Sequence, residues 1–156
     1  MVLVLPETNL MLTPFSGKCA CRSISYIGNA TPAFAWNCQC RDCQRASGGG
    51  QCPVLYVPKS AVELQGDLTY YTVKAESGNG VDRGFCGTCG SPMCIRAELV
   101  PELIGLWAGS LDDPEQFSPQ INVWTSSAPN WIFLNENLPH SDHAPTAAQL
   151  QRLLES

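Results

Sequence analysis

Residues 17–28 read GKCACRSISYIG, and the residue types in this stretch alternate with a period of two. Such alternation predicts a β-strand that places Ile24 and Tyr26 on one face and the cysteines on the other. Cys19 and Cys21 stand two positions apart, so on a strand their side chains project from the same face. Both sulfur atoms could therefore bind one metal ion.

A second close pair of cysteines, Cys86 and Cys89, lies in the segment FCGTCGS at 85–91. Gly87 and Gly90 permit a tight turn that aims backbone amides at the two sulfurs. Structural zinc sites take four ligands in a tetrahedron, and two cysteine pairs from distant segments are a usual way to supply them. The two pairs together could close a four-cysteine zinc site.

Three further cysteines, Cys38, Cys40 and Cys43, fall within the short stretch CQCRDC. Catalytic zinc sites characteristically have three protein ligands and one exchangeable position, so these three could form an open zinc site. Spacing alone leaves two alternatives. Cys38 and Cys40 could pair with the C-x-x-C instead, or the chain could hold one four-cysteine site with the other thiols buried. The remaining cysteines, Cys52 and Cys94, are interpreted as buried small apolar residues.

The donor set of the three-cysteine group favours thiol chemistry. Three thiolates and Zn²⁺ sum to a charge of −1, and donation from three sulfurs makes the ion a weaker Lewis acid than a three-histidine site would. Such an ion suits a soft fourth ligand, for example a substrate thiolate. A nucleoside deaminase needs a His-x-Glu element, and His140 and His143 are the only histidines, neither in such an element. We interpret both as surface or loop residues.

The composition predicts one mainly β domain over residues 15–156, preceded by an extension over 1–14. The chain has 156 residues with 13 glycines and 12 prolines, which favours short strands over long helices. Further strands are expected at 54–57, 68–73, 93–97, 103–109, 121–124 and 131–134.

Three segments are expected to form structure other than strands. A loop or hairpin tip is expected at 74–84, and one short helical turn at 110–117. The only helix expected is C-terminal, where Thr146 and Gln149 fit a capping box.

The charge and hydropathy of the chain exclude two classes of partner. The formal charge is −5 and no basic run exists, so we expect no nucleic-acid surface. No segment has the roughly 18 apolar residues of a membrane span, and the N-terminus is a poor signal peptide. We therefore expect a cytoplasmic protein in a reducing setting, whose nine cysteines hold metal rather than form disulfides.

The assembled motifs resemble the glutathione-dependent formaldehyde-activating enzyme (GFA) family, also called the GFA/centromere-protein-V domain. The matching segments are GKCACRSISY, CQCRDCQRASGG, FCGTCGSPM and GSLDDP, in this order over residues 17–114, and INVWTSSAPNW at 121–131 extends the match. The resemblance implies a β-tent fold of mostly antiparallel sheets that holds two zinc ions. By position, the matching ligands are Cys19, Cys21, Cys86 and Cys89 for the structural zinc, and Cys38, Cys40 and Cys43 for the catalytic-type zinc.

The resemblance also implies carbon–sulfur lyase chemistry, in which formaldehyde and glutathione form S-hydroxymethylglutathione. Arg41 and Arg45 flank the open site and are candidates for binding the glutathione carboxylates, although they could equally offset the negative zinc–thiolate group. Two other functions stay open: a zinc-binding module for protein contacts, and a thiol-based metal or redox sensor. The open three-cysteine group favours the enzyme.

Two positions depart from the common pattern of the family. The family often has glycine where this chain has Arg22, directly after the first C-x-C, and a strand tolerates that change. It often has histidine where this chain has Gln39, at the centre of the second C-x-C, and that change could alter substrate contacts.

Overall fold

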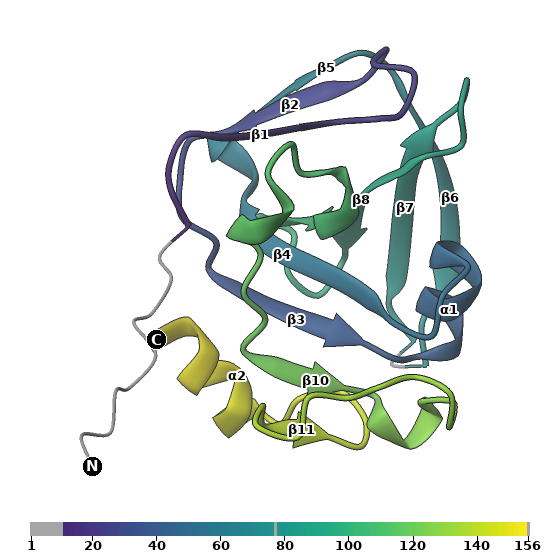
Figure 1. Ribbon diagram of the computed structural model, residues 1–156, viewed down its shortest axis with the longest axis vertical. Helices are drawn as coiled ribbons and strands as arrows, with labels where there is room; N and C mark the ends of the chain where they lie inside the picture. The colour runs from purple at the N-terminus through teal and green to yellow at the C-terminus, as the bar shows by residue number, and fades with distance from the viewer. Residues whose placement is uncertain (1–10, 77, 156) are drawn as a thin grey trace.

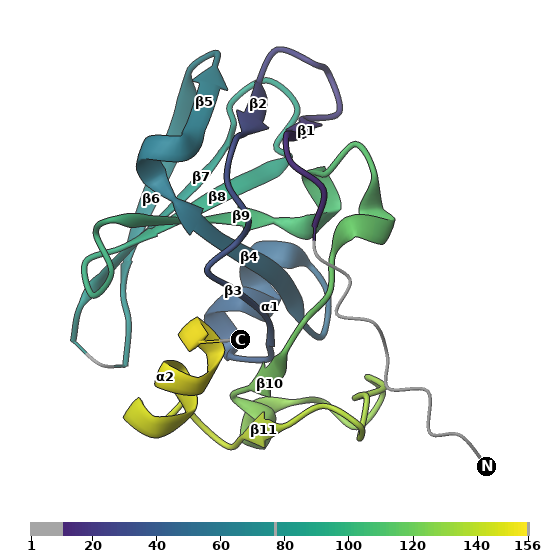
Figure 2. The ribbon, with the colours of Figure 1, turned by 90° about the vertical axis from the view of Figure 1, so that its left-hand side faces the viewer.

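The computed structural model describes residues 11–76 and 78–155, so most of the expected extension lies outside the described residues. The strands of this part form two sheets, one of three strands in the order β1-β2-β5 and one of eight in the order β11-β10-β3-β4-β9-β8-β7-β6. The smaller sheet lies across one end of the larger sheet, as both ribbon views show (Figures 1 and 2). The expected mainly β fold is confirmed.

The strands are β1 (Phe15–Lys18), β2 (Ser25–Gly28), β3 (Phe34–Cys38), β4 (Cys52–Pro58), β5 (Val62–Gln65), β6 (Leu68–Lys74), β7 (Gly80–Cys86), β8 (Pro92–Ala97), β9 (Leu103–Trp107), β10 (Ile121–Val123) and β11 (His140–Ser141). The helices are α1 (Arg41–Ser47) and α2 (Ala147–Glu155), with 3-10 turns η1 (Lys59–Ala61), η2 (Ala108–Ser110), η3 (Pro114–Gln116) and η4 (Thr125–Ser127).

The larger sheet is mixed rather than wholly antiparallel. Strand β10 pairs in parallel with both β3 and β11, whereas the other strand pairs are antiparallel. The register sets Val123 opposite Cys38, and the Gln39 amide donates to the Val123 carbonyl at 3.0 Å. This pairing fixes the chain where β3 ends and the CQCRDC stretch begins.

Two groups of buried side chains form the core. The first includes Tyr26 of β2 with Met93 and Leu106 of the larger sheet, and so joins the two sheets. The second includes Ile121 of β10 and Leu153 of α2, which covers this end of the larger sheet. Because both groups consist mainly of apolar side chains, their burial stabilises the arrangement of the elements that carry the cysteines.

The prediction of one continuous strand over 17–28 is wrong. The chain forms the hairpin β1–β2 instead, and Cys19 and Cys21 lie in the turn between the two strands. The Arg22 amide donates to the Cys19 carbonyl at 3.0 Å and the Cys19 amide donates to the Ile24 carbonyl at 3.0 Å, which closes the turn. A turn lets two sulfurs converge on one point without the strand geometry that the alternation suggested.

Other element predictions have mixed outcomes. No strand forms at 131–134, where Trp131 and Phe133 are largely exposed to solvent. The expected loop at 74–84 is shorter, because β7 already begins at Gly80. The helical turn expected within 110–117 is η3, and the Asp113 side chain accepts from the Glu115 amide at its start.

The C-terminal helix is confirmed as α2, and so is its capping box. The Thr146 amide donates to Gln149 Oε1 at 2.9 Å, while the Gln149 amide donates to Thr146 Oγ1 at 3.2 Å. Within the described residues, no helix combines the length and the apolar character that crossing a membrane requires.

Candidate metal centres

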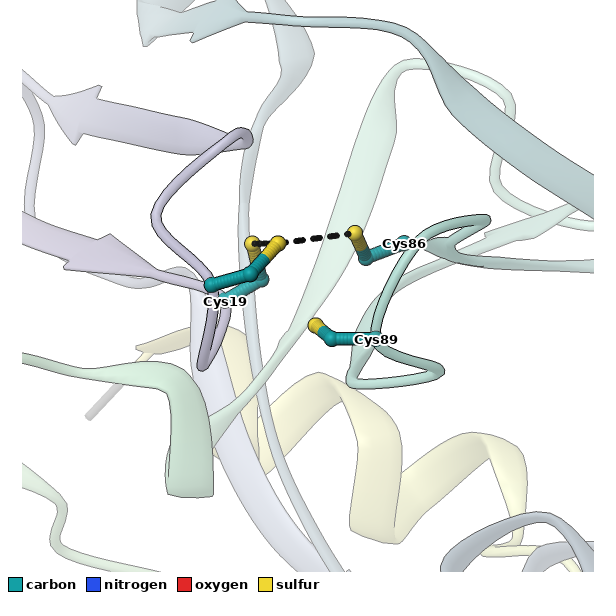
Figure 3. A group of neighbouring side chains, drawn as sticks. Cys19, Cys86 and Cys89 are labelled. Atoms are coloured by element: carbon teal, nitrogen blue, oxygen red, sulfur yellow. Dashed lines mark hydrogen bonds between the residues drawn. The ribbon is translucent and has the colours of Figure 1, made fainter.

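The first cluster, defined as Cys19, Cys21, Cys86 and Cys89, brings four sulfur atoms within 4.8 Å of one another. The β1–β2 turn supplies one pair and the β7–β8 turn supplies the other (Figure 3). The Cys21 sulfur lies 3.5 Å from that of Cys19 and 3.6 Å from that of Cys86. Sulfurs at the corners of a tetrahedron around zinc stand about 3.8 Å apart, given a Zn–S distance of about 2.3 Å. The positions of the four sulfurs therefore fit a tetrahedral zinc site.

Polar groups of the β1–β2 turn orient these sulfurs. The Ile24 amide donates to Cys19 Sγ at 3.3 Å. The Ser23 hydroxyl lies 3.1 Å from Cys21 Sγ and 3.3 Å from Cys86 Sγ, so it contacts one sulfur of each pair. Hydrogen bonds of this kind stabilise thiolates and fix their direction, as outer-shell groups do around bound metals.

The β7–β8 turn has the tight geometry that its glycines predict. Gly90 has a φ of 76°, a left-handed conformation that favours glycine, and its amide donates to the Cys86 carbonyl at 2.8 Å. Ser91 follows, and its hydroxyl and amide lower the pKa of Cys89 to about 5. The Ser91 hydroxyl also accepts from the Ala20 amide at 3.1 Å, which ties the two turns together.

Arg22 has a backbone conformation that the expected strand would not require. Its φ is 66°, in the left-handed region that is unfavourable for a residue with a β-carbon. The expectation that Arg22 lies in a strand, which would tolerate a residue other than glycine, is therefore wrong. The residue directly after the C-x-C pair has a left-handed conformation in this turn. Glycine adopts that conformation without a steric cost, which explains why glycine is favoured at this position.

We expect the Arg22→Gly protein to be more stable than the parent chain, by about 0.5–1 kcal/mol in the free energy of unfolding. A left-handed residue with a β-carbon costs about 1–2 kcal/mol, and glycine removes this cost. The greater flexibility of glycine in the unfolded chain lowers the stability by about 0.5–1 kcal/mol, so a net gain remains. Urea denaturation of the metal-loaded proteins measures the difference. Arg22→Ala keeps the β-carbon and serves as the control that should show no gain. If the Arg22→Gly protein is less stable than the parent chain, the backbone at Arg22 is not strained.

The second cluster, defined as Cys38, Cys40 and Cys43, brings three sulfurs within 4.8 Å of one another. Cys38 ends β3, Cys40 is the N-cap of α1, and Cys43 lies in the first turn of that helix. The Cys40 sulfur accepts from the Cys43 amide at 3.3 Å. The two clusters divide the cysteines as the resemblance implies, since the first cluster contains none of the three.

The thiols of the second cluster interact closely and shift one another's pKa. Hydrogen bonds from the thiols of Cys38, Cys40 and Cys52 hold the pKa of Cys43 well below its ordinary value, and the Arg83 charge adds to this effect. The hydrogen bonds with Cys40 and Cys43, together with burial, raise the pKa of Cys38. A bound divalent cation would reverse that increase, because metal ligation requires the deprotonated form.

Cys52 and Cys94 are fully buried, as expected. Cys52 of β4 lies opposite Cys38 in the antiparallel pairing and its thiol hydrogen-bonds to Cys43. It is nevertheless outside the group of sulfurs that lie within 4.8 Å of one another. The second cluster therefore offers three ligands, with Cys52 beside it.

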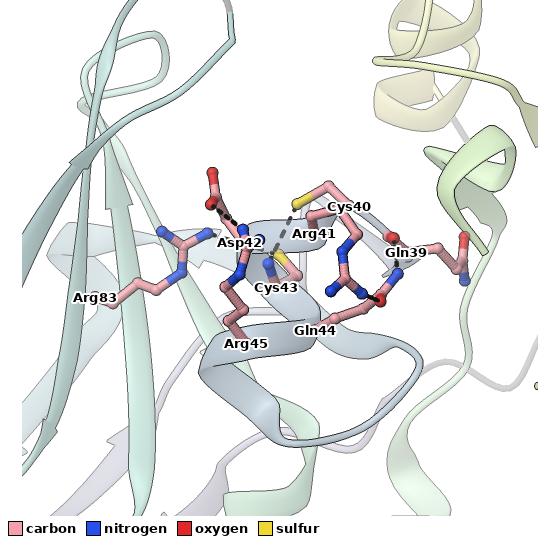
Figure 4. Close-up of polar contacts among 8 residues, drawn as sticks. All are labelled: Gln39, Cys40, Arg41, Asp42, Cys43, Gln44, Arg45 and Arg83. Carbon is pink, nitrogen blue, oxygen red and sulfur yellow. Dashed lines mark hydrogen bonds and ion pairs between the residues drawn. The ribbon is translucent and has the colours of Figure 1, made fainter. Parts of the chain in front are cut away.

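Arg83 is a functional candidate that the sequence analysis misses. It lies on β7, forty positions from Cys43, and its Nη2 donates to Cys43 Sγ at 3.8 Å. Figure 4 shows its guanidinium directed from β7 toward Cys43 and Asp42 of α1. No local pattern points to this contact, since it depends on how β7 packs against α1.

Arg41 and Arg45, which lie close to the second cluster in sequence, contact other side chains of α1. Arg41 bonds to the side-chain oxygen of Gln44, and Arg45 pairs with Asp42 at 3.8 Å (Figure 4). Both arginines are exposed on α1. The structure gives neither a contact with Cys43.

Gln39 is fully buried and supports the scaffold through hydrogen bonds, while its side-chain oxygen Oε1 has no hydrogen-bond partner among the described residues. Its side-chain amide donates to Gln51 Oε1 at 3.3 Å, and its carbonyl accepts from the Gln44 side chain at 2.6 Å. These bonds join the end of β3 to α1 and to the start of β4. The departure from histidine at this position therefore affects packing beneath the cluster.

A cavity of about 770 Å³ lies next to the first cluster, with Cys19 in its lining, and its lining includes none of the three cysteines of the second cluster. Its lining includes Cys19 and Arg22 from the β1–β2 turn, and Gln51 and Trp107 from the part of the sheet that adjoins the second cluster. A separate cavity of about 470 Å³, lined by residues such as Phe34 and Leu153, contains no cysteine. The first has the size of a small-molecule site and borders the first cluster.

Comparisons with known proteins agree with these features. The family model described as "Glutathione-dependent formaldehyde-activating enzyme" matches residues 14–127. A Halomonas elongata protein named "Putative glutathione-dependent formaldehyde-activating enzyme" is 22% identical over 130 residues, which cover 74% of this chain and 78% of that protein. A crystal structure of a Rhodobacter sphaeroides protein shares the fold with a TM-score of 0.53 at 18% identity, over 81% of this chain and 99% of that one.

The family match includes every cysteine of both clusters and extends over well more than half of the chain. It also agrees with the resemblance that the cysteine motifs suggested. The chain belongs to the glutathione-dependent formaldehyde-activating enzyme family.

Proposed function

We propose that this protein is a zinc-dependent carbon–sulfur lyase that acts on the adduct of a small thiol and a small aldehyde, of the S-hydroxymethylglutathione type. The observation that carries the proposal is the second cluster, where three convergent sulfurs offer three ligands rather than four. A metal held by three protein ligands keeps one position for an exchangeable group. Membership of the family supports glutathione and formaldehyde as the substrates.

The chemistry is a reversible addition of a thiol to a carbonyl group. The thiolate sulfur attacks the carbonyl carbon, a carbon–sulfur bond forms, the π pair moves to oxygen, and that oxygen takes a proton from solvent. In reverse, the hydroxyl loses its proton, the carbonyl re-forms, and the carbon–sulfur bond breaks with its electron pair on sulfur. Zinc bound to the second cluster would lower the pKa of the substrate thiol and so supply thiolate near neutral pH.

The residues of the chain hold and complete this centre. Cys38, Cys40 and Cys43 are the proposed ligands, on a strand end and a helix start that the β3–β10 pairing fixes. Arg41 and Arg45 remain the proposed contacts of the glutathione carboxylates, and would exchange their present partners on α1 for the substrate. All nine cysteines are free thiols, which fits a reducing compartment such as the cytoplasm.

The test of this proposal is the rate of adduct formation from formaldehyde with glutathione, cysteine and 2-mercaptoethanol, each against a background without protein. We expect a rate several-fold above background with at least one thiol, and the reverse reaction from the isolated adduct. Rates equal to the background with every thiol would contradict the enzyme and favour a zinc-binding module.

A thiol substrate is also expected to add one sulfur to the metal environment. With four ligands in one cluster and three in the other, zinc X-ray absorption should give an average of about 3.5 sulfurs per zinc, rising to about 4 with glutathione. S-methylglutathione has no free thiol and is the matched control, for which no rise is expected. An unchanged sulfur count with glutathione would exclude thiol binding at the metal.

A further inference from the structure

Arg83 has hydrogen-bond donors that the protein leaves unused. Its Nε and Nη1 atoms are buried and have no partner, while Nη2 donates to Cys43 Sγ at 3.8 Å. A guanidinium carries five N–H donors in a rigid plane, and a buried donor without a partner costs about 1–3 kcal/mol. A cation that keeps two unpartnered donors beside the Cys43 sulfur therefore points to an acceptor that the protein itself does not supply.

The charges around Arg83 leave it available to such an acceptor. The acidic groups near the guanidinium include the Cys43 thiol, which it contacts, and the Asp42 carboxylate, both on α1. Of these, Asp42 pairs with Arg45 at 3.8 Å (Figure 4). The contact with Cys43 uses one nitrogen, so the other two remain for a further group.

The donors of Arg83 lie where they could contact the aldehyde-derived oxygen of the proposed reaction. Because the guanidinium is planar and rigid, fixing Nη2 beside Cys43 also fixes Nε and Nη1 within a few ångströms of the same sulfur. In the adduct, the oxygen that gains negative charge stands only two bonds from the substrate sulfur. A group that holds the oxygen must lie close to the sulfur site, as Arg83 does.

We propose that Arg83 binds the aldehyde-derived oxygen of the thiol adduct through Nε–H, which shares an edge of the guanidinium with the Nη2 atom beside Cys43, and stabilises the negative charge that develops there. This inference rests on the proposed carbon–sulfur chemistry. When the thiolate attacks the carbonyl carbon, the π pair moves to the oxygen, and Nε–H donates a hydrogen bond to it without transferring a proton. The proton that completes the hydroxyl comes from solvent. Arg83 also balances the charge of −1 that three thiolates and Zn²⁺ sum to.

The test compares Arg83→Met, which removes the charge, with Arg83→Lys, which keeps the charge but loses the fork of donors. Loss of donors to a developing oxyanion lowers kcat by about 100-fold, so we expect this for Arg83→Met and a smaller loss for Arg83→Lys. The KM for the thiol should change little. Free guanidinium ion should restore part of the activity of Arg83→Met and should not activate the parent protein.

The matched control is Arg96→Met, in a neighbouring strand, whose guanidinium lies over the Tyr70 ring instead of the second cluster. It should retain kcat. Zinc content is measured for each variant, and if Arg83→Met loses metal, the kcat of the metal-loaded Arg83→Lys protein decides.

Three results would overturn the assignment. Unchanged kcat in Arg83→Met excludes a role of Arg83 in the reaction. If the Arg83→Lys protein is fully active and guanidinium does not rescue the Arg83→Met protein, Arg83 only balances charge. A parent protein without activity above background removes the proposed function itself, and that failure is visible before any variant is made.

Discussion

The Cys86→Ser protein is expected to lose the metal of the first cluster and, with it, the native fold at physiological temperature. Cys86 ends β7, is buried, and lies 3.6 Å from the Cys21 sulfur of the other turn. The cluster joins the smaller sheet to the β7–β8 end of the larger one. Structural zinc in small domains contributes about 10–16 kcal/mol, against a total stability of about 5–15 kcal/mol. The loss of one ligand therefore removes a contribution as large as the net stability of the domain, and the apolar core that also joins the sheets does not offset it.

The measurements are zinc per chain and the thermal melt followed by circular dichroism. Cys94→Ser is the matched control, because Cys94 is also fully buried and on a neighbouring strand but belongs to neither cluster. It should keep its metal and show only the loss of about 1–3 kcal/mol expected for a buried polar substitution. A Cys86→Ser protein that keeps its full metal content and melts within a few degrees of the parent would show that the first cluster is not structural.

The cysteine clusters could be predicted from the sequence because metal ligation imposes short, recognisable spacings. A C-x-C and a C-x-x-C can each aim two sulfurs at one point, and the structure brings Cys19 and Cys21 together with Cys86 and Cys89. The α2 helix could also be predicted, because its capping box and its apolar positions lie within one segment. In these cases the physical cause acts over a few neighbouring residues.

The turn around Arg22 and the helix α1 could not be predicted in the same way. Alternation of residue types over 17–28 suggests a strand, but the convergence of the four sulfurs requires a turn in the middle of it. The α1 helix has seven residues, too few to show a helical period, and it forms around the cap that Cys40 provides. Here the arrangement of the ligands overrides local preference.

Arg83 shows why long-range contacts are lost to sequence reasoning. Arg41 and Arg45 are adjacent to the second cluster in sequence, yet their side chains bond to Gln44 and Asp42 on their own helix. The arginine that contacts Cys43 comes from another strand, and only the packing of β7 against α1 places it there. The sequence therefore contains no indication of the contact between Arg83 and Cys43, and the proposed role of Arg41 and Arg45 toward glutathione stays a prediction.

The Cys40→Ser protein is expected to lose catalysis while it keeps its fold. Cys40 is the N-cap of α1 and its sulfur accepts from the Cys43 amide at 3.3 Å. Serine is among the best N-cap residues, so the helix should retain its cap and the melting temperature should change by only a few degrees. With two thiolates left, the second cluster should no longer hold zinc, and zinc per chain should fall from two ions to one. Adduct formation should then fall to the background rate.

The control for this variant is Cys52→Ala, which also decides how many sulfurs the second metal uses. Cys52 lies beside the cluster and bonds to Cys43, but it is outside the group of three mutually close sulfurs. If three cysteines bind the metal, Cys52→Ala keeps two zinc ions and its kcat, at a modest cost in stability from the small cavity. If Cys52→Ala loses the second zinc as Cys40→Ser does, four cysteines close the site. A closed site has no position for a substrate thiol, and the proposed function would then be wrong.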